Sequence, residues 1–139
     1  MDVCDLIKSN EGFRSQAYMD ATGNLTIGYG TNLHSGLTEF EAATLLNSRI
    51  SELIDDMTDT WVWFKSLDPV RSAVLVDMAY NLGLPGLHKF NCMLDHISKG
   101  EWDLAADDML TSHYAQQLPK RAGNNAELMR TGTWTTPKP

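Results

Sequence analysis

The sequence of 139 residues has only two cysteines, no long apolar run and no excess of basic residues. Cys4 and Cys92 lie far apart and outside any paired motif, which excludes a disulfide framework or a zinc site and suits a reducing compartment. No apolar stretch approaches the roughly 20 residues of a membrane span, so we expect no stable membrane insertion. The amino end lacks a basic segment followed by an apolar stretch, and we therefore expect synthesis in the cytoplasm.

The charge balance argues against nucleic acid as a partner. The formal net charge at pH 7 is −7, whereas binding to a phosphate backbone depends on clustered lysine and arginine. With 42% hydrophobic residues, the chain has enough apolar side chains to close one core. We therefore expect a single folded domain that acts as a monomer and does not bind nucleic acid.

The first part of the chain combines helical and extended patterns. Apolar residues at helical spacing behind Asp2 predict a first helix that ends near Glu11. A β-hairpin is predicted over 17–30, because the polar turn 21–24 separates two extended runs. A capping box at 38–41 then opens a long helix.

Helical signals continue through the rest of the chain. Asp68 is a helix cap and Pro69 a favoured first helical residue, and the apolar spacing carries this helix to Leu82. A break follows at 83–86, and the region around His113 is another predicted break. Shorter helices are expected at about 90–98, 101–110 and 119–129.

These patterns predict an α+β fold class that is predominantly helical. A small lobe with a short β-hairpin or sheet is expected over about 12–38, and a linking helix over about 39–57. The helical lobe is expected over about 58–139, together with the first helix.

The sequence predicts no metal site and no organic cofactor. The histidines lack the i, i+4 spacing of metal ligands, and none adjoins a cysteine or carboxylate motif. Gly28 and Gly30 resemble the start of a phosphate-binding loop, but no third glycine opens a helix behind them, so a tight strand exit is predicted. The segment 20–24 lacks the glycine and closing glutamate of a calcium loop.

Two carboxylates and a hydroxyl remain as candidate catalytic groups. If Gly23 takes the left-handed position of the hairpin loop, Asp20 and Thr26 lie opposite each other and share a face; a two-residue turn at 23–24 would shift that register by one. Glu11 would then stand across a gap from Asp20, and a pair of carboxylates is what glycoside hydrolysis requires. Both acids are also common at such positions for structural reasons, so spacing alone leaves a solvated pair open.

Three motifs resemble the active-site region of the phage-type lysozymes, glycoside hydrolase family 24: EGFR at 11–14, AYMD at 17–20 and GNLTIGYG at 23–30. The resemblance continues downstream over essentially the whole chain, through SLDPVR at 66–71, EWDLAA at 101–106, PKRA at 119–122 and RTGTW at 130–134. It implies a lysozyme-like fold of two lobes joined by a long helix.

The resemblance also implies an activity and its residues. The family's muramidases cleave, with inversion, the β-1,4 bond between N-acetylmuramic acid and N-acetylglucosamine in bacterial peptidoglycan. By resemblance, Glu11 is the general acid, and Asp20 with Thr26 positions and activates the attacking water. The implied substrate contacts are Asn32, Tyr80, Met93 and Asp108, and Arg121 is the implied partner of the catalytic glutamate.

Each implied substrate contact has a structural alternative. For Tyr80 and Met93 the alternative is core packing, and for Asp108 it is a solvated helix face. The stretch between Gly30 and Thr38 is shorter than in the family, which leaves the number of strands in the sheet open.

The resemblance implies cell-wall lysis that releases phage. A lytic enzyme made in the host cytoplasm would depend on a holin to reach the cell wall and periplasm. Two alternatives stay open: a lytic transglycosylase, and an inactive peptidoglycan-binding or virion structural module. Asp20 and Thr26 favour hydrolysis, because a transglycosylase uses a hydroxyl of the substrate and has less need of them.

Overall fold

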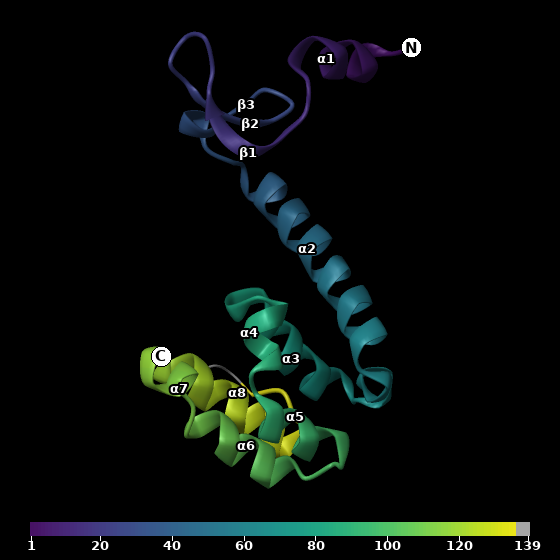
Figure 1. The fold of residues 1–139 in the computed structure, drawn as a ribbon, viewed down its shortest axis with the longest axis vertical. Coiled ribbons are helices and arrows are strands. Elements are labelled where there is room, and N and C mark those ends of the chain that lie inside the picture. The colour runs from purple at the N-terminus through teal and green to yellow at the C-terminus, as the bar shows by residue number, and fades with distance from the viewer. Residues whose placement is uncertain (136–139) are drawn as a thin grey trace. The chain divides into compact units, whose positions relative to one another are not determined.

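The computed structural model describes residues 1–135 (Figure 1). The chain divides into two compact units, one over Met1–Leu46 and the other from Asn47 onward. The predominantly helical α+β class predicted from the sequence is confirmed. In order, the elements are α1 (Val3–Glu11), β1 (Arg14–Met19), β2 (Leu25–Gly28), β3 (Thr31–Asn32), the 3₁₀ helix η1 (Leu33–Ser35), α2 (Glu39–Thr60), the 3₁₀ helix η2 (Val62–Ser66), α3 (Pro69–Leu82), α4 (Leu84–His88), α5 (Asn91–Ser98), α6 (Trp102–Leu110), α7 (His113–Gln117) and α8 (Pro119–Thr131). The last four residues of the predicted helical lobe, 136–139, lie outside the described residues.

Helix α1 begins and ends where the sequence predicts. The Asp2 side chain accepts a hydrogen bond from the Asp5 N–H at 2.9 Å, and the Asp5 side chain accepts one from the Asp2 N–H at 3.0 Å. This reciprocal cap satisfies two backbone donors that the first turn leaves unpaired. The helix stops at Gly12, whose φ of 71° interrupts the helical backbone after Glu11.

The sheet has three antiparallel strands in the order β1-β2-β3. The third strand, of two residues, was not predicted, because so short a strand has no visible alternation. Gly28 and Gly30 both have positive φ, 68° and 76°, at the turn between β2 and β3. This confirms the predicted tight strand exit, since L-residues with side chains rarely adopt such angles.

The hairpin register differs from the one derived from the sequence. Gly23 does have a positive φ of 84°, but Tyr18, not Asp20, is the residue paired with Thr26. The Asp20 N–H donates to the Asn24 carbonyl at 2.9 Å, so the loop contains residues 21–23. The predicted direct opposition of Asp20 and Thr26 is therefore wrong. The two residues are diagonal neighbours, and the period of two along a strand still assigns them to one face.

The second unit contains the hydrophobic core. Helices α5, α6 and α8 pack on one another, with α3 against α8 (Figure 1). Five methionines at 1% exposure or less lie in this core, where their flexible thioethers fill irregular space: Met57, Met78, Met93, Met109 and Met129. No helix within residues 1–135 is long and apolar enough to cross a membrane.

Two predicted breaks in the helical unit are in fact short helices. Gly83, with φ of 76°, does end α3, but α4 begins at the next residue and places Pro85 in its first turn. Proline is tolerated there because the first helical N–H groups have no partner within the helix. Around the predicted break at His113, Ser112 caps α7 by accepting a hydrogen bond from Ala115 N at 3.3 Å. The long helix α2 also continues to Thr60, beyond the predicted end near 57.

Arg71 ties α3 to the end of α8. Its side chain, 13% exposed, donates from Nε to the Met129 carbonyl at 2.6 Å and from Nη2 to the Arg130 carbonyl at 3.0 Å. Its Cζ lies 4.1 Å from the centroid of the Trp102 ring. These contacts satisfy carbonyls that the last turn of α8 leaves unpaired.

We expect Arg71→Met to lower the free energy of unfolding by about 2 kcal/mol, because charge-assisted hydrogen bonds to two carbonyls and a cation–π contact are lost together. Thermal unfolding followed by circular dichroism at pH 7 measures this loss. The matched control is Lys99→Met, which removes a cation whose ion pair with Asp95 is exposed. Such a pair contributes little to the free energy of unfolding. Equal losses in the two variants would contradict the assignment of Arg71 as a structural clamp.

Candidate active site

Asp20 lies at the end of β1 with one carboxylate oxygen held by the hairpin loop. Its Oδ1 accepts hydrogen bonds from Thr22 N at 2.9 Å, Thr22 Oγ1 at 2.8 Å and Asn24 N at 2.8 Å. These hydrogen bonds, above all those from the Asn24 backbone and the Thr22 hydroxyl, lower the pKa of Asp20 below its usual value. The carboxylate is therefore ionised at neutral pH, as a base requires.

Thr26 is the buried member of the predicted catalytic group, at 3% exposure. Its Oγ1 donates a hydrogen bond to the Asn24 carbonyl at 2.9 Å. The same carbonyl accepts the Asp20 N–H, so the Asn24 backbone links the two predicted residues. Because the one hydroxyl proton of Thr26 is used in this bond, its oxygen is left as an acceptor for a water.

Glu11 is the last residue of α1 and its carboxyl group lies against the β2–β3 turn. A Cβ built on Gly30 would stand 2.6 Å from Glu11 Cδ, so the two residues are in close contact. Lys8 and Phe13 both lie over the Tyr29 ring, at 5.5 Å from its centroid in each case, and hold the end of α1 beside this turn. Within residues 1–46, the Glu11 carboxyl accepts no hydrogen bond from the protein.

The two carboxylates of this unit thus have different surroundings. The ionised form of Asp20 is stabilised by three hydrogen-bond donors. Glu11 instead lies at the end of α1 against Gly30, which has no side chain. General acid–base catalysis needs one group that accepts a proton, and the hydrogen bonds on Asp20 suit it to that role.

Asn32 lies beside Thr26 in the sheet. The two residues are register partners between β2 and β3, so their side chains share a face. The Asn32 side-chain oxygen accepts a hydrogen bond from His34 N at 2.9 Å and caps η1. The Asn32 amide nitrogen is the part of this side chain that could contact a substrate.

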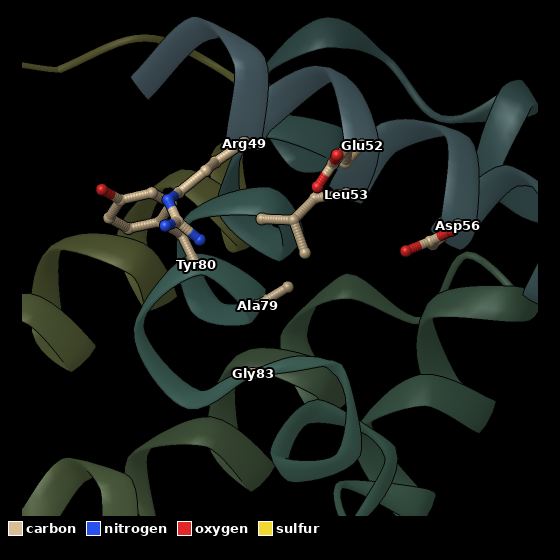
Figure 2. Close-up of a pocket in the computed structure, with 7 residues that line it drawn as sticks. All are labelled: Arg49, Glu52, Leu53, Asp56, Ala79, Tyr80 and Gly83. Carbon is tan, nitrogen blue, oxygen red and sulfur yellow. The ribbon is translucent and has the colours of Figure 1, made fainter. Parts of the chain in front are cut away.

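The structure separates Tyr80 from Met93. Tyr80, 47% exposed, lines an open groove of about 430 Å³ between the second half of α2 and the end of α3 (Figure 2). Met93, at 1% exposure, lies in the core. Core packing was the alternative to substrate contact for both residues. The structure places Met93 in the core and leaves Tyr80 exposed.

Figure 2 shows how the groove beside Tyr80 is built. Leu53 and Ala79 form its apolar part, and Arg49, Glu52 and Asp56 add charged side chains from α2. These residues were not predicted from the sequence as part of a site. A period of 3.6 identifies the helix face on which they lie, but nothing local indicates that α3 ends beside it.

Asp108 is neither free nor simply solvated. Its Oδ2 lies 2.5 Å from His96 Nδ1, and this contact joins α6 to α5. The Asp108 side chain is 30% exposed and the His96 side chain 26% exposed. A substrate that contacts Asp108 would meet this pair rather than a lone carboxylate.

Arg121 is held by Asp77. Its Nε and Nη2 donate to the two carboxylate oxygens at 3.0 and 2.6 Å, a bidentate arrangement. Asn125 donates to Asp77 at 2.8 Å and to the Tyr114 hydroxyl at 3.0 Å, so the ion pair is backed by a buried polar network. The pairing of Arg121 with Glu11 stays a prediction.

Asp77 makes stability depend on pH. Burial raises the pKa of Asp77, but hydrogen bonds from Arg121 and Asn125 outweigh it, and the pKa in the folded state lies below the ordinary value of 3.8. A carboxyl group with a depressed pKa stabilises the fold above its unfolded-state pKa, and that contribution is lost as the pH falls through the folded-state value.

We therefore expect Asp77→Asn to lower the melting temperature at pH 7. Its effect should shrink as the pH falls from 3.8 through the lower folded-state pKa of Asp77, because the wild type loses the same contribution over that range. Thermal unfolding at a series of pH values measures the difference. Asp95→Asn, at an exposed ion pair, is the control and should change little. A difference that is constant with pH would contradict the linkage.

Within residues 1–135, no three histidine, cysteine, aspartate or glutamate side chains gather closely enough to hold a metal ion.

A small antiparallel sheet in a predominantly helical chain is consistent with a lysozyme-like fold. The family model described as phage lysozyme matches residues 8–125, and the chain belongs to this family. It is accordingly a lysozyme-like peptidoglycan hydrolase, a glycoside hydrolase.

Three curated relatives match nearly the whole chain. The probable T4-type lysozymes 2 and 1 of Dictyostelium discoideum are each 24% identical; the alignments cover 93% and 94% of this chain and 94% and 95% of those proteins. The pre-baseplate central spike protein Gp5 of Enterobacteria phage T4 is 25% identical over 95% of this chain, but only 28% of that protein is covered.

Proposed function

We propose that the protein is an N-acetylmuramidase that cleaves the β-1,4 bond between N-acetylmuramic acid and N-acetylglucosamine in bacterial peptidoglycan. The observation that carries the proposal is the set of hydrogen bonds on Asp20, beside a glutamate whose carboxyl group lies at the end of α1. Asp20 is held ionised by the hairpin loop, and Glu11 lies unpaired within that unit against Gly30. The hydrogen bonds on Asp20 support its role as the base, and the acid role of Glu11 follows the family resemblance.

In the proposed reaction, Glu11 donates its proton to the glycosidic oxygen as the bond to the anomeric carbon breaks. A water held by Asp20 and the Thr26 hydroxyl attacks that carbon from the opposite side, and its proton passes to Asp20. The products are one new reducing end and one free hydroxyl, with inverted configuration. The residue roles and the inversion follow the family resemblance.

The substrate contacts are part of the same proposal. Asn32 and Tyr80 present accessible side chains for sugar groups, and Asp108 presents a carboxylate paired with His96. Met93 would act through the packing of α5 rather than by direct contact, because it is buried. Arg121 would pair with Glu11, as the family resemblance implies. A cation there favours the ionised carboxylate, so substrate binding would have to favour the protonated acid. The charge of Arg121 is compensated by Asp77.

We further propose a biological role in cell-wall lysis for phage release. The protein would act as a monomer, be made in the host cytoplasm and depend on a holin to reach the cell wall. Expression with and without a pore-forming partner, followed by culture turbidity, tests this role. We expect rapid clearing only with the partner, and equal clearing without it would contradict the dependence.

The enzymatic proposal is tested on purified peptidoglycan by measuring the chemistry of the new chain ends. A muramidase releases reducing ends. A lytic transglycosylase would instead leave anhydro ends, and an inactive binding or structural module would release neither. Either of the last two outcomes would overturn the proposal.

A further inference from the structure

The Asp20 carboxylate has one anchored oxygen and one oxygen outside that anchor. All three hydrogen bonds from the loop end on Oδ1, and none of them involves Oδ2. Two of the donors are backbone N–H groups, which nearly any residue could supply. The third is the Thr22 hydroxyl, at 2.8 Å, which depends on the side chain at position 22.

The proton of the Thr22 hydroxyl is itself directed toward Asp20. Asn24 Nδ2 donates a hydrogen bond to Thr22 Oγ1 at 3.0 Å. A hydroxyl that accepts a hydrogen bond in this way still has one proton to donate, and within residues 1–135 its acceptor is Asp20 Oδ1. The three side chains form a short polar chain, Asn24 to Thr22 to Asp20, in which each bond strengthens the next.

We propose that Thr22 is a positioning residue for Asp20, supported by Asn24, and that it anchors Oδ1 so that Oδ2 is presented to the attacking water. The inference rests on the proposed function, because it deepens the role of Asp20 as the group that activates water. It assigns to the loop a part in catalysis beyond that of a turn. A carboxylate base with one oxygen already anchored loses less orientational freedom when the water binds to the other oxygen.

No charged neighbour substitutes for these hydrogen bonds. The causes of the lowered pKa of Asp20 are hydrogen bonds from Asn24 and Thr22, opposed by burial, and no ion pair contributes. The titratable groups of α1 are Cys4, Asp5, Lys8 and Glu11. Those of the sheet, the β2–β3 turn and η1 are Arg14, Tyr18, Tyr29 and His34.

The test compares Thr22→Val, which removes the hydroxyl at nearly constant shape, with Thr22→Ser, which retains it. For Thr22→Val we expect kcat to fall by about tenfold with KM unchanged. The acid limb of the pH profile should move to higher pH, because loss of a hydrogen bond to the ionised form raises the pKa of Asp20. Thr22→Ser should restore both, and Asn24→Ala should shift the acid limb in the same direction by less.

Thr44→Val is the matched control, because it removes a hydroxyl that bonds only to the backbone of α2, at Phe40 O. It should leave kcat and the pH profile unchanged. Wild-type values for Thr22→Val, or equal losses in Thr22→Val and Thr22→Ser, would overturn the inference.

An NMR titration of the Asp20 carboxyl group separates this inference from the proposed function. It needs no turnover, so it can be read even if the wild type releases no reducing ends and the muramidase proposal fails. A higher pKa of Asp20 in Thr22→Val than in the wild type supports the anchoring by Thr22. An unchanged pKa would overturn it.

Discussion

Replacement of Glu11 by glutamine is expected to reduce the rate of peptidoglycan hydrolysis by about 10³-fold or more, because a general acid contributes on the order of 10² to 10⁴. The amide has nearly the shape of the carboxyl group but cannot protonate the leaving oxygen. Within the first unit the Glu11 side chain makes no hydrogen bond that supports the fold, and it is exposed. The melting temperature should therefore stay close to that of the wild type.

The matched control for this variant is Glu127→Gln, which makes the same chemical change at an exposed position on α8. It should retain wild-type activity. Substantial residual activity in Glu11→Gln would contradict the role of Glu11 as the general acid. A large loss of melting temperature would instead indicate that Glu11 supports the fold.

Replacement of Gly30 by alanine is expected to cut kcat by about 100-fold, since displacement of a catalytic group by about 1 Å can cost that much. The new Cβ would stand 2.6 Å from Glu11 Cδ, and the carboxyl group would have to move. Gly30 also has a φ of 76°, so the alanine carries backbone strain of about 1 kcal/mol.

Gly36→Ala separates the two effects of this substitution. Gly36 has a similar φ of 72°, but a Cβ there would meet no atom within 4 Å. This control should therefore show the strain as a small loss of stability, with activity near that of the wild type. Equal activity of the Gly30 and Gly36 variants would contradict the contact between Gly30 and the acid.

All six helices predicted from the sequence are present. Three of them, α5, α6 and α8, begin without a side-chain cap, whereas the other three begin at one. Asp2 caps α1, Asp68 caps α3 ahead of Pro69, and the box at 38–41 caps α2. Such signals act over a few residues and can be seen in the sequence. The missed elements, α4, α7 and β3, have five, five and two residues, too few for a hydrophobic period to emerge.

The candidate site could be predicted only in part, because local motifs indicate some of its residues, whereas the positions of others depend on loop closure or on contacts far apart in the sequence. The motifs identified Glu11, Asp20 and Thr26, but the register of Thr26 depended on where the loop closes, which glycine spacing alone does not determine. Thr22 was missed because an aspartate followed by a threonine and an asparagine is also an ordinary turn.

The partners of the more distant residues could not be predicted from local pattern. Asp108 bonds to His96 because α5 packs on α6, and Arg121 bonds to Asp77 across 44 positions of sequence. Tyr80 and Met93 are both large side chains on helices, and only the packing of neighbouring helices makes one exposed and the other buried. Periodicity indicates a face of a helix but not what covers it.

The most direct test of the account follows the water itself. Peptidoglycan is digested by the wild-type protein in water enriched in heavy oxygen, and the fragments are weighed by mass spectrometry. If a water activated by Asp20 and Thr26 attacks the anomeric carbon, every new reducing end gains one heavy oxygen atom. Fragments that end in an unlabelled anhydro sugar would contradict the account, because an internal hydroxyl would then have taken the place of water.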